Sequence, residues 1–335
     1  MCENERRGTN VYTDLAMETA ESLMEGSAGI EGVSMDVDEK PIEGDMVKVT
    51  WITIHSKEGE AALGKPMGNY VTAECAAMKA NDIEAHEGVI KVLVDLLADL
   101  KSFREAKSVL VAGLGNWNAT PDALGPRVLS KLLVTRHLQE VWPEGFEPGE
   151  LRSVCGISPG VLGITGIETG EIIKGIVEHT KPDLVIAVDA LAARSARRVN
   201  ATIQFSDTGL RPGSGMGAGR RALNFETIGV PVLAIGVPTV VDAATLVNDT
   251  LDLVISEMAD NVDENSAFYD TLQNLEEEDK YSMIKRVLDP YVGSMFVTPK
   301  DVDVVIDRLS NIIANALNIA LHPGISKEDI NRYMY

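Results

Sequence analysis

Two aspartates in this 335-residue sequence follow apolar runs that are typical of buried parallel strands. Asp122 comes after the apolar run 109–111 and a glycine turn, and Thr120-Pro121 is typical of the N-cap and first residue of a helix. Asp189 directly follows the apolar run 184–188. Open α/β folds carry their chemistry at the carboxyl ends of parallel strands. The sequence therefore predicts that both carboxylates meet at one sheet edge as an acid/base pair.

Each aspartate also has a purely structural interpretation. An Asp in the first turn of a helix is stabilising through the helix dipole, which would account for Asp122. Asp189 could cap the small-residue segment that follows it. A matched pair at one sheet edge favours the catalytic interpretation over these two separate structural ones.

Shorter motifs predict turns rather than active sites. Gly113-Leu114-Gly115 lacks the third glycine of a dinucleotide-binding fingerprint, and the glycine-rich segment 213–219 lacks the Lys-Ser/Thr pair of a phosphate loop. Segment 156–160 matches a nucleophile elbow, but Pro159 has no N–H to offer an oxyanion. Asp207-Thr208-Gly209 matches the triplet of pepsin-like proteases but occurs once, so we expect a turn there.

The composition limits the classes of protein to which the chain can belong. With 45% apolar residues it can bury a large core. A formal charge of −21 repels phosphate backbones, so we expect no direct nucleic-acid partner. No apolar run approaches the roughly 18 residues of a membrane-spanning helix, so no membrane partner is expected either. The polar, acidic N-terminus does not resemble a signal peptide, and a soluble cytoplasmic protein is predicted.

Cysteine and histidine are too scattered to indicate a metal centre. The three cysteines, Cys2, Cys75 and Cys155, have neither zinc-site spacing nor a disulfide framework. The histidines show no HExxH or paired-ligand spacing. They are His55, His86, His137, His179 and His322. We therefore expect no metal and no cofactor.

An acidic leader and one α/β domain are predicted. Residues 1–45 carry twelve Asp or Glu against three basic residues, which is typical of a mobile leader. From residue 46 to 335, strands and helices alternate, so we expect a parallel-rich mixed sheet with helices on both faces. Thr239-Val240-Val241-Asp242 is typical of a capping box that begins a helix. Residues 256–290 lose the pattern and gain charge, which indicates a surface insertion.

A series of motifs, in this order along the chain, resembles the spore germination proteases of endospore-forming bacteria. They are Gly113-Leu114-Gly115-Asn116, Thr120-Pro121-Asp122-Ala123-Leu124-Gly125-Pro126, Pro159-Gly160-Val161, Thr165-Gly166-Ile167-Glu168-Thr169, Asp189-Ala190-Leu191-Ala192-Ala193-Arg194, Arg198-Val199-Asn200-Ala201-Thr202-Ile203-Gln204, Pro212-Gly213-Ser214-Gly215 and Gly236-Val237-Pro238-Thr239-Val240-Val241-Asp242-Ala243. The resemblance spans most of the chain from residue 14 to residue 321 and departs mainly in the leader and in segment 256–290.

The resemblance implies a fold similar to that of the hydrogenase maturation proteases. It implies an atypical aspartic endopeptidase that is made as a zymogen and assembles as a homotetramer, with Asp122 and Asp189 as the catalytic pair. The implied substrates are the small acid-soluble proteins that coat spore DNA and are degraded at germination. The enzyme would then act in the cytoplasm of the spore core.

The resemblance also implies a self-processing bond. The family cleaves between an acidic residue and a bulky apolar residue that is followed by Ala, any residue and Glu. Asp14-Leu15-Ala16-Met17-Glu18 fits this pattern. Cleavage is therefore expected between Asp14 and Leu15, which would make residues 1–14 a propeptide and residues 15–45 the remaining acidic leader.

Two other functions stay open at this point. A metal-assisted maturation-type endopeptidase on the same fold would hold a metal ion between Asp122 or Asp189 and a histidine, although no histidine has suitable spacing. A non-enzymatic binding or regulatory module would use the same carboxylates only to contact a ligand.

Overall fold

A mixed β-sheet runs through the computed structural model, which describes residues 13–24, 29–141, 150–213, 221–260, 283–284, 286–288, 290 and 295–325. Its nine strands lie in the order β1-β2-β3-β7-β8-β6-β4-β5, with β9 beside β8. They are β1 (Val33–Ile42), β2 (Asp45–Ile54), β3 (Gly68–Glu74), β4 (Ser108–Gly113), β5 (Ser153–Ile157), β6 (Leu184–Ala193), β7 (Thr202–Ser206), β8 (Val232–Asp242) and β9 (Phe296–Val297). Strands β8, β6, β4 and β5 are parallel, and the other pairings are antiparallel. The predicted α/β class with a parallel-rich mixed sheet is confirmed.

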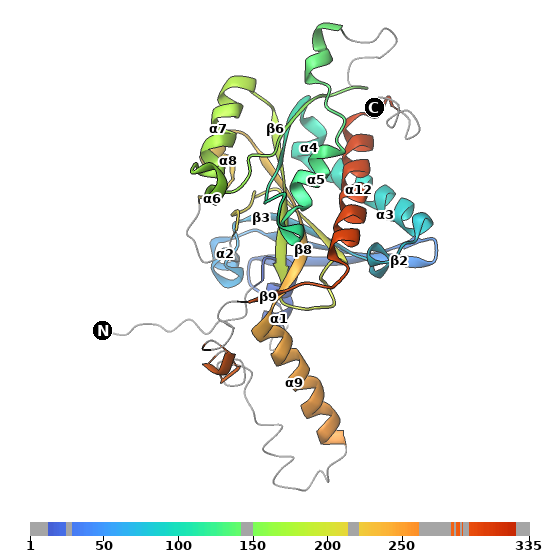
Figure 1. The fold of residues 1–335 in the computed structure, drawn as a ribbon, viewed down its shortest axis with the longest axis vertical. Helices are drawn as coiled ribbons and strands as arrows, with labels where there is room; N and C mark the ends of the chain where they lie inside the picture. Colours follow the sequence, from blue (N-terminus) through green and yellow to red (C-terminus); the bar gives the residue numbers. More distant parts are fainter. Residues whose placement is uncertain are drawn as a thin grey trace, which may run out of the picture.

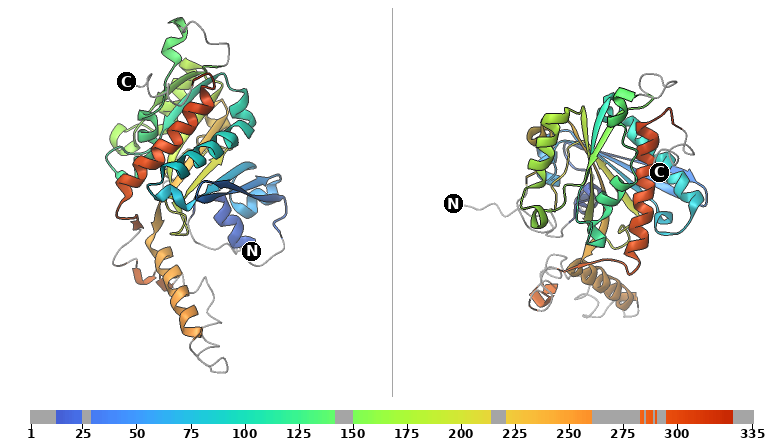
Figure 2. Two further views of the ribbon diagram at one scale, coloured as in Figure 1. Left: turned by 90° about the vertical axis from the view of Figure 1, so that its right-hand side faces the viewer. Right: turned by 45° about the horizontal axis from the view of Figure 1, so that its top comes forward.

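Helices cover both faces of the parallel half (Figures 1 and 2). On one face lie α3 (Ile83–Asp99), α5 (Leu124–Ser130) and α12 (Val302–Leu321), and on the other lie α7 (Thr169–Thr180) and α8 (Phe225–Ile228). The other helices whose bounds lie within the described residues are α1 (Ala16–Met24), α2 (Lys57–Leu63), α4 (Lys101–Glu105), α6 (Leu162–Thr165) and α9 (Ala243–Asp260), with 3₁₀ turns η1 (Ala76–Lys79), η2 (Thr120–Asp122) and η3 (Arg136–Val141).

Strand β4 shows why its sequence is continuously apolar from Val109 to Ala112. Val109 and Val111 pack into the cluster with α3 and α12, whereas Leu110 and Ala112 pack into the cluster with α7 and α8. A strand that is buried on both faces has no solvent side on which polar residues could alternate.

The N-terminal segment is folded, contrary to the predicted mobile leader over residues 15–45. Residues 16–24 form α1, and β1 pairs with β2 along its whole length. The expected boundary between residues 45 and 46 therefore falls at the turn of a β-hairpin. The composition gave a wrong prediction because β1 is a largely exposed, polar strand. Backbone pairing holds this strand, and its acidic side chains give no sign of that pairing. Residues 1–12, most of the predicted propeptide, lie outside the described residues.

Two further expectations concern the region after β8. The predicted capping box at Thr239–Asp242 is wrong, because β8 continues through Asp242 before α9 begins. Most of the predicted insertion at 256–290 lies outside the described residues. Helix α9, which leads into that segment, extends away from the sheet and its covering helices (Figures 1 and 2).

Helix α12 is a core helix. It has the length and hydropathy that a membrane-spanning helix would need, but 61% of its apolar window is buried inside the protein. Its side chains pack with those of α3 and of the central strands. His322 follows it directly, is fully buried, and places Nε2 at 3.1 Å from the carbonyl oxygen of Leu133.

His322 should make the stability of the fold sensitive to mild acid. Burial lowers the pKa of His322 to about 4. An unfolded histidine binds a proton near pH 6.5, so unfolding takes up a proton between these values and stability falls as the pH falls. We expect the chain to lose about 2 kcal/mol between pH 7 and pH 5 from this residue. Urea unfolding at both pH values should show a smaller loss for His322→Gln, and equal losses would contradict the assignment.

Candidate active site

Asp189 lies on β6 at the point where its neighbour β4 leaves the sheet. Gly113, the last residue of β4, lies opposite Val188, so no β4 residue pairs with Asp189. Strand β6 itself continues to Ala193, and the prediction that the strand ends before Asp189 was wrong. The side chain is 6% exposed, and its Oδ1 accepts a hydrogen bond from the N–H of Ala190 at 3.0 Å. A buried carboxylate thus lies beside the gap that the end of β4 leaves along β6.

Asp122 lies in the connection that fills this gap. It is the last residue of η2, a 3₁₀ turn ahead of α5, and not part of the first α-helical turn as predicted. The N–H of Asn116 donates to its Oδ2 at 2.8 Å and to its carbonyl oxygen at 3.1 Å. The Thr239 hydroxyl donates to the carbonyl oxygen of Pro121 at 2.7 Å. These contacts hold η2 against the loop that precedes it and against β8.

Two glycines allow the turn and α5 to approach the sheet this closely. Gly115 has φ +110°, and a Cβ there would lie 1.9 Å from the carbonyl oxygen of Asp122. A Cβ at Gly125 would lie 2.4 Å from the Leu114 nitrogen and the Val188 oxygen. Side chains at either position would push η2 or α5 off the strand edge.

A cavity of about 500 Å³ brings the two aspartates together. Asp122 and Asp189 both line it, and so does Asp14 from the N-terminal segment. Its other lining residues come mainly from the loops after β4 and β5 and from the outer ends of β6 and β8. The sheet edge, the carboxylate pair and the predicted processing site therefore meet in one cavity.

Asp14 docks on β6 beside the aspartates. Its N–H donates to the carbonyl oxygen of Ala192 at 3.0 Å, and its Oδ2 accepts from the Ala192 N–H at 2.9 Å. Leu15 is fully buried in an apolar cluster with Ala193, Val199 and Val241. Two hydrogen bonds to Ala192 thus hold Asp14, and an apolar pocket holds Leu15, directly before α1 begins at Ala16.

The carbonyl oxygen of Asp14 accepts hydrogen bonds from two side chains that line a second cavity. It accepts from Lys65 Nζ at 2.9 Å and from Gln204 Nε2 at 3.3 Å. The Gln204 Oε1 accepts from the N–H of Ala16 at 2.7 Å. Lys65, Gln204 and Asp14 line this second cavity, of about 280 Å³.

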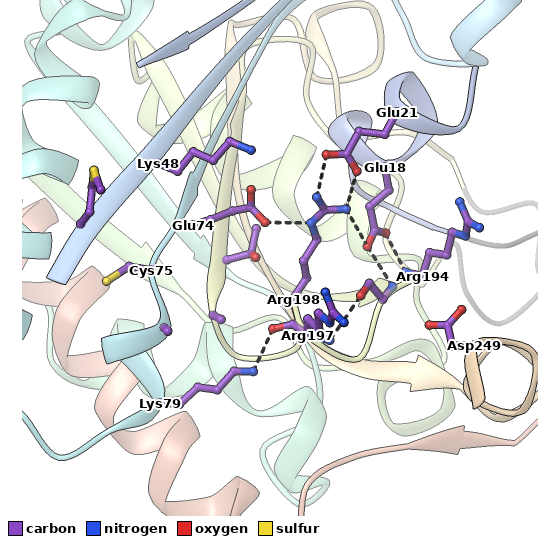
Figure 3. A pocket seen from close by; sticks show the side chains of 15 residues that line it. Glu18, Glu21, Lys48, Glu74, Cys75, Lys79, Arg194, Arg197, Arg198 and Asp249 are labelled. Carbon is purple, nitrogen blue, oxygen red and sulfur yellow. Dashed lines mark hydrogen bonds and ion pairs between the residues drawn. The ribbon is translucent and has the colours of Figure 1, made fainter. Parts of the chain in front are cut away.

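Glu18 occupies a carboxylate pocket one helical turn further on. Its two oxygens accept from the N–H groups of Arg194, at 2.6 Å, and Ser195, at 2.9 Å. Arg198 lies 3.4 Å from Glu18 and also pairs with Glu21 and Glu74 (Figure 3). Burial by itself lowers the pKa of Arg198, but its hydrogen bonds and charge pairing with Glu21 and Glu74 raise it overall. The guanidinium therefore stays charged and gives buried Glu18 its counter-charge.

Other singled-out motifs have structural roles. Asp207 accepts from the backbone and side-chain nitrogens of Asn69 at 2.8 and 2.7 Å, so the Asp207-Thr208-Gly209 triplet closes a turn. Segment 156–160 is a strand end and a turn. Residues 214–220, most of the predicted glycine loop, lie outside the described residues. In the described part of the chain, no group of three or more His, Cys, Asp or Glu side chains is placed to hold a metal ion.

Nearly the whole sequence matches a known peptidase family. The family model described as "Germination protease" matches residues 11–273 and 257–334. The chain belongs to the germination protease family. It is therefore a protease, a hydrolase of peptide bonds.

Germination proteases of several bacteria are similar to the chain over almost their full length. The protein of Clostridium tetani is 49% identical over 97% of this chain and 99% of its own. That of Caldanaerobacter subterraneus subsp. tengcongensis is 47% identical over 97% and 98%, and that of Bacillus velezensis is 42% identical over 96% of each. Among solved structures, the [NiFe] hydrogenase maturation protease HycI from Thermococcus kodakarensis KOD1 is 17% identical, with a TM-score of 0.32, over 68% of this chain and 98% of its own.

The sequence patterns did not identify three residues of this germination protease family member that contact its N-terminal segment. These residues are Lys65, Gln204 and Arg198. Arg198 and Gln204 begin and end one of the motifs that carry the family resemblance, so that motif was a usable signal. Lys65 stands between α2 and β3 with no motif around it. Only the tertiary fold brings its ammonium to the N-terminal segment.

Gly115→Ala should impair the peptidase without unfolding it. The added Cβ would displace Asp122, and a shift of about 1 Å in a reacting group can cost about 10²-fold in rate. Gly163→Ala is the matched control, since Gly163 lines the same cavity and a Cβ there meets nothing within 4 Å. Cleavage of a synthetic peptide spanning residues 10–20 measures both variants. Equal rates for the two would show that the position of η2 does not matter.

Proposed function

We propose that the chain is a zymogen endopeptidase of atypical aspartic type in which Asp122 and Asp189 activate one water molecule. The observation that carries this proposal is the shared cavity, because both carboxylates and Asp14 line it. Neither carboxylate is a good nucleophile toward an amide. Attack by water, with one aspartate as base and the other as acid, is the mechanism that the pair supports best.

Local contacts divide the two roles. Each carboxylate accepts a backbone N–H that favours its charged form, Asp122 from Asn116 and Asp189 from Ala190, so the lesser burial of Asp122 assigns it the role of base. Asp189 is more deeply buried, and burial favours the protonated form that an acid needs. Two carboxylates in one cavity do not both ionise easily, so the pair would share a proton.

We propose self-processing at the bond between Asp14 and Leu15. The segment Asp14 to Glu18 fits the cleavage pattern that the family resemblance implies. Its contacts support this proposal: hydrogen bonds to Ala192 for Asp14, an apolar pocket for Leu15 and a charged pocket for Glu18. The zymogen would thus hold its own processing site in the groove that later receives substrates.

The same contacts support small acid-soluble spore proteins as substrates, cleaved during germination. Such proteins would present an acidic residue, a bulky apolar residue and, three residues after the latter, a glutamate. The apolar pocket and the Arg198 pocket would accept the last two. The family relatives carry the name germination protease, which agrees with this timing.

We further propose a homotetramer that works without a cofactor in the cytoplasm of the spore core, as the family resemblance implies. Helix α9 extends away from the sheet and exposes Leu251, Leu253 and Val254. An exposed apolar helix face is a surface that a second copy of the chain would cover.

Asp122→Asn and Asp189→Asn should each block self-processing. Loss of a general acid or base lowers the rate by about 10²- to 10⁴-fold. Mass spectrometry of the incubated full chain should show loss of residues 1–14 in the parent but not in either variant. Asp95→Asn, at an exposed position on α3, is the matched control and should process normally. Processing of the double variant would reject the aspartic mechanism, and loss of parental activity in a chelator would favour the metal-assisted alternative.

Arg198 should recognise the substrate glutamate that takes the position of Glu18. Replacing Glu by Gln at the position of Glu18 in the 10–20 peptide should raise KM about tenfold for the processed enzyme, because hydrogen bonds to charged groups contribute about 1.5–3 kcal/mol. With Arg198→Met the two peptides should differ much less. An undiminished preference for Glu in that variant would assign recognition elsewhere.

A further inference from the structure

Two side-chain donors converge on one backbone oxygen in the N-terminal segment. Lys65 Nζ and Gln204 Nε2 lie 2.9 and 3.3 Å from the carbonyl oxygen of Asp14. Lys65 belongs to the connection between α2 and β3, and Gln204 belongs to β7. Separate elements therefore position the two donors independently of the peptide that they bind.

The second bond of Gln204 fixes the orientation of its amide. Its Oε1 accepts from the N–H of Ala16 at 2.7 Å, which turns the NH₂ group toward Asp14. The side chain is 7% exposed. One glutamine thus bridges the residues on either side of Leu15 and keeps the peptide bond between Asp14 and Leu15 in a fixed position.

Lys65 is a partly buried cation beside a neutral carbonyl group. Burial lowers the pKa of its ammonium, while the charges of Asp14 and Glu18 act in the opposite direction. A positive charge in such a site interacts more strongly with a nearby anion than it would in water. A neutral carbonyl oxygen makes little use of that charge, whereas an oxyanion at the same position would use it fully.

The two hydrogen-bond donors and the two aspartates line different cavities next to Asp14. Asp122 and Asp189 line the cavity of about 500 Å³, and Lys65 and Gln204 line the cavity of about 280 Å³. Asp14 lines both. Attack on a carbonyl from one side with the oxygen held on another is the arrangement that hydrolysis requires.

We propose that Lys65 and Gln204 form the oxyanion hole of this peptidase, for its own Asp14–Leu15 bond and for the matching bond of protein substrates. The inference rests on the proposed function. Water adds to the Asp14 carbonyl carbon and gives a proton to the basic aspartate, and the C=O π electrons move to the oxygen that Lys65 and Gln204 hold. The C–N bond then breaks as the nitrogen of Leu15 takes a proton from the acidic aspartate, which leaves a carboxyl group and a free amine.

The test compares Lys65→Met, Lys65→Arg and Gln204→Glu with the parent and with Asp122→Asn. Gln204→Glu keeps the acceptor for Ala16 but replaces the donor to Asp14. The readouts are the processing rate of each full chain and kcat and KM of the processed enzyme on the 10–20 peptide. Lys57→Met, which removes an exposed lysine from α2, is the matched control and should behave as the parent.

Lys65→Met should lower kcat about 10²- to 10³-fold with little change in KM, because an oxyanion-hole donor acts mainly in the transition state. Lys65→Arg should recover part of that loss, and Gln204→Glu should lower kcat as well. A kcat within about threefold of the parent for Lys65→Met and Gln204→Glu, or a change in KM alone, would overturn the proposal. If Lys65→Met does not fold, the other two variants decide. An active Asp122→Asn would instead reject the proposed function itself.

Discussion

The early departure of β4 from the sheet is the constraint on which the candidate site depends. Strand β4 ends opposite Val188, whereas β6 continues five residues beyond it to Ala193. No β4 residue therefore lies opposite Asp189, which is buried on β6. The connection to α5 fills the gap and brings Asp122 to it. Gly115 and Gly125 make this close packing possible.

The part of β6 that continues beyond β4 has a second role, because no strand pairs with its backbone on the β4 side. Asp14 pairs with Ala192 on that edge, three residues after Asp189. Side-chain pockets then hold Leu15, directly before α1, and Glu18, in the first turn of α1. One strand therefore supplies a catalytic candidate, a peptide-docking edge and part of an apolar pocket. These contacts explain why residues 14–18, which sequence composition describes as part of a mobile leader, are held in place.

Sequence patterns predicted the parallel half of the fold well because its strands are continuously apolar. They also singled out Asp122 and Asp189, which line one cavity and whose catalytic role stays a prediction, because charged residues directly beside buried strands are rare and easily noticed. The antiparallel half was harder, because β1 is polar and acidic and is held by its backbone. Lys65 had no sequence signal at all, since its role depends on a contact between residues 51 positions apart. The extent of β6 was missed because small residues such as Ala190 and Ala192 do not mark a strand.

The most direct test of the account is a crystal structure of the full-length Asp122→Asn variant, which should remain unprocessed. The account predicts an ordered water molecule within hydrogen-bond distance of residues 122 and 189, facing the carbonyl carbon of Asp14, with the carbonyl oxygen on Lys65 and Gln204. Side chains at 122 and 189 that point into separate solvent regions, with no position from which one water could contact both, would contradict it.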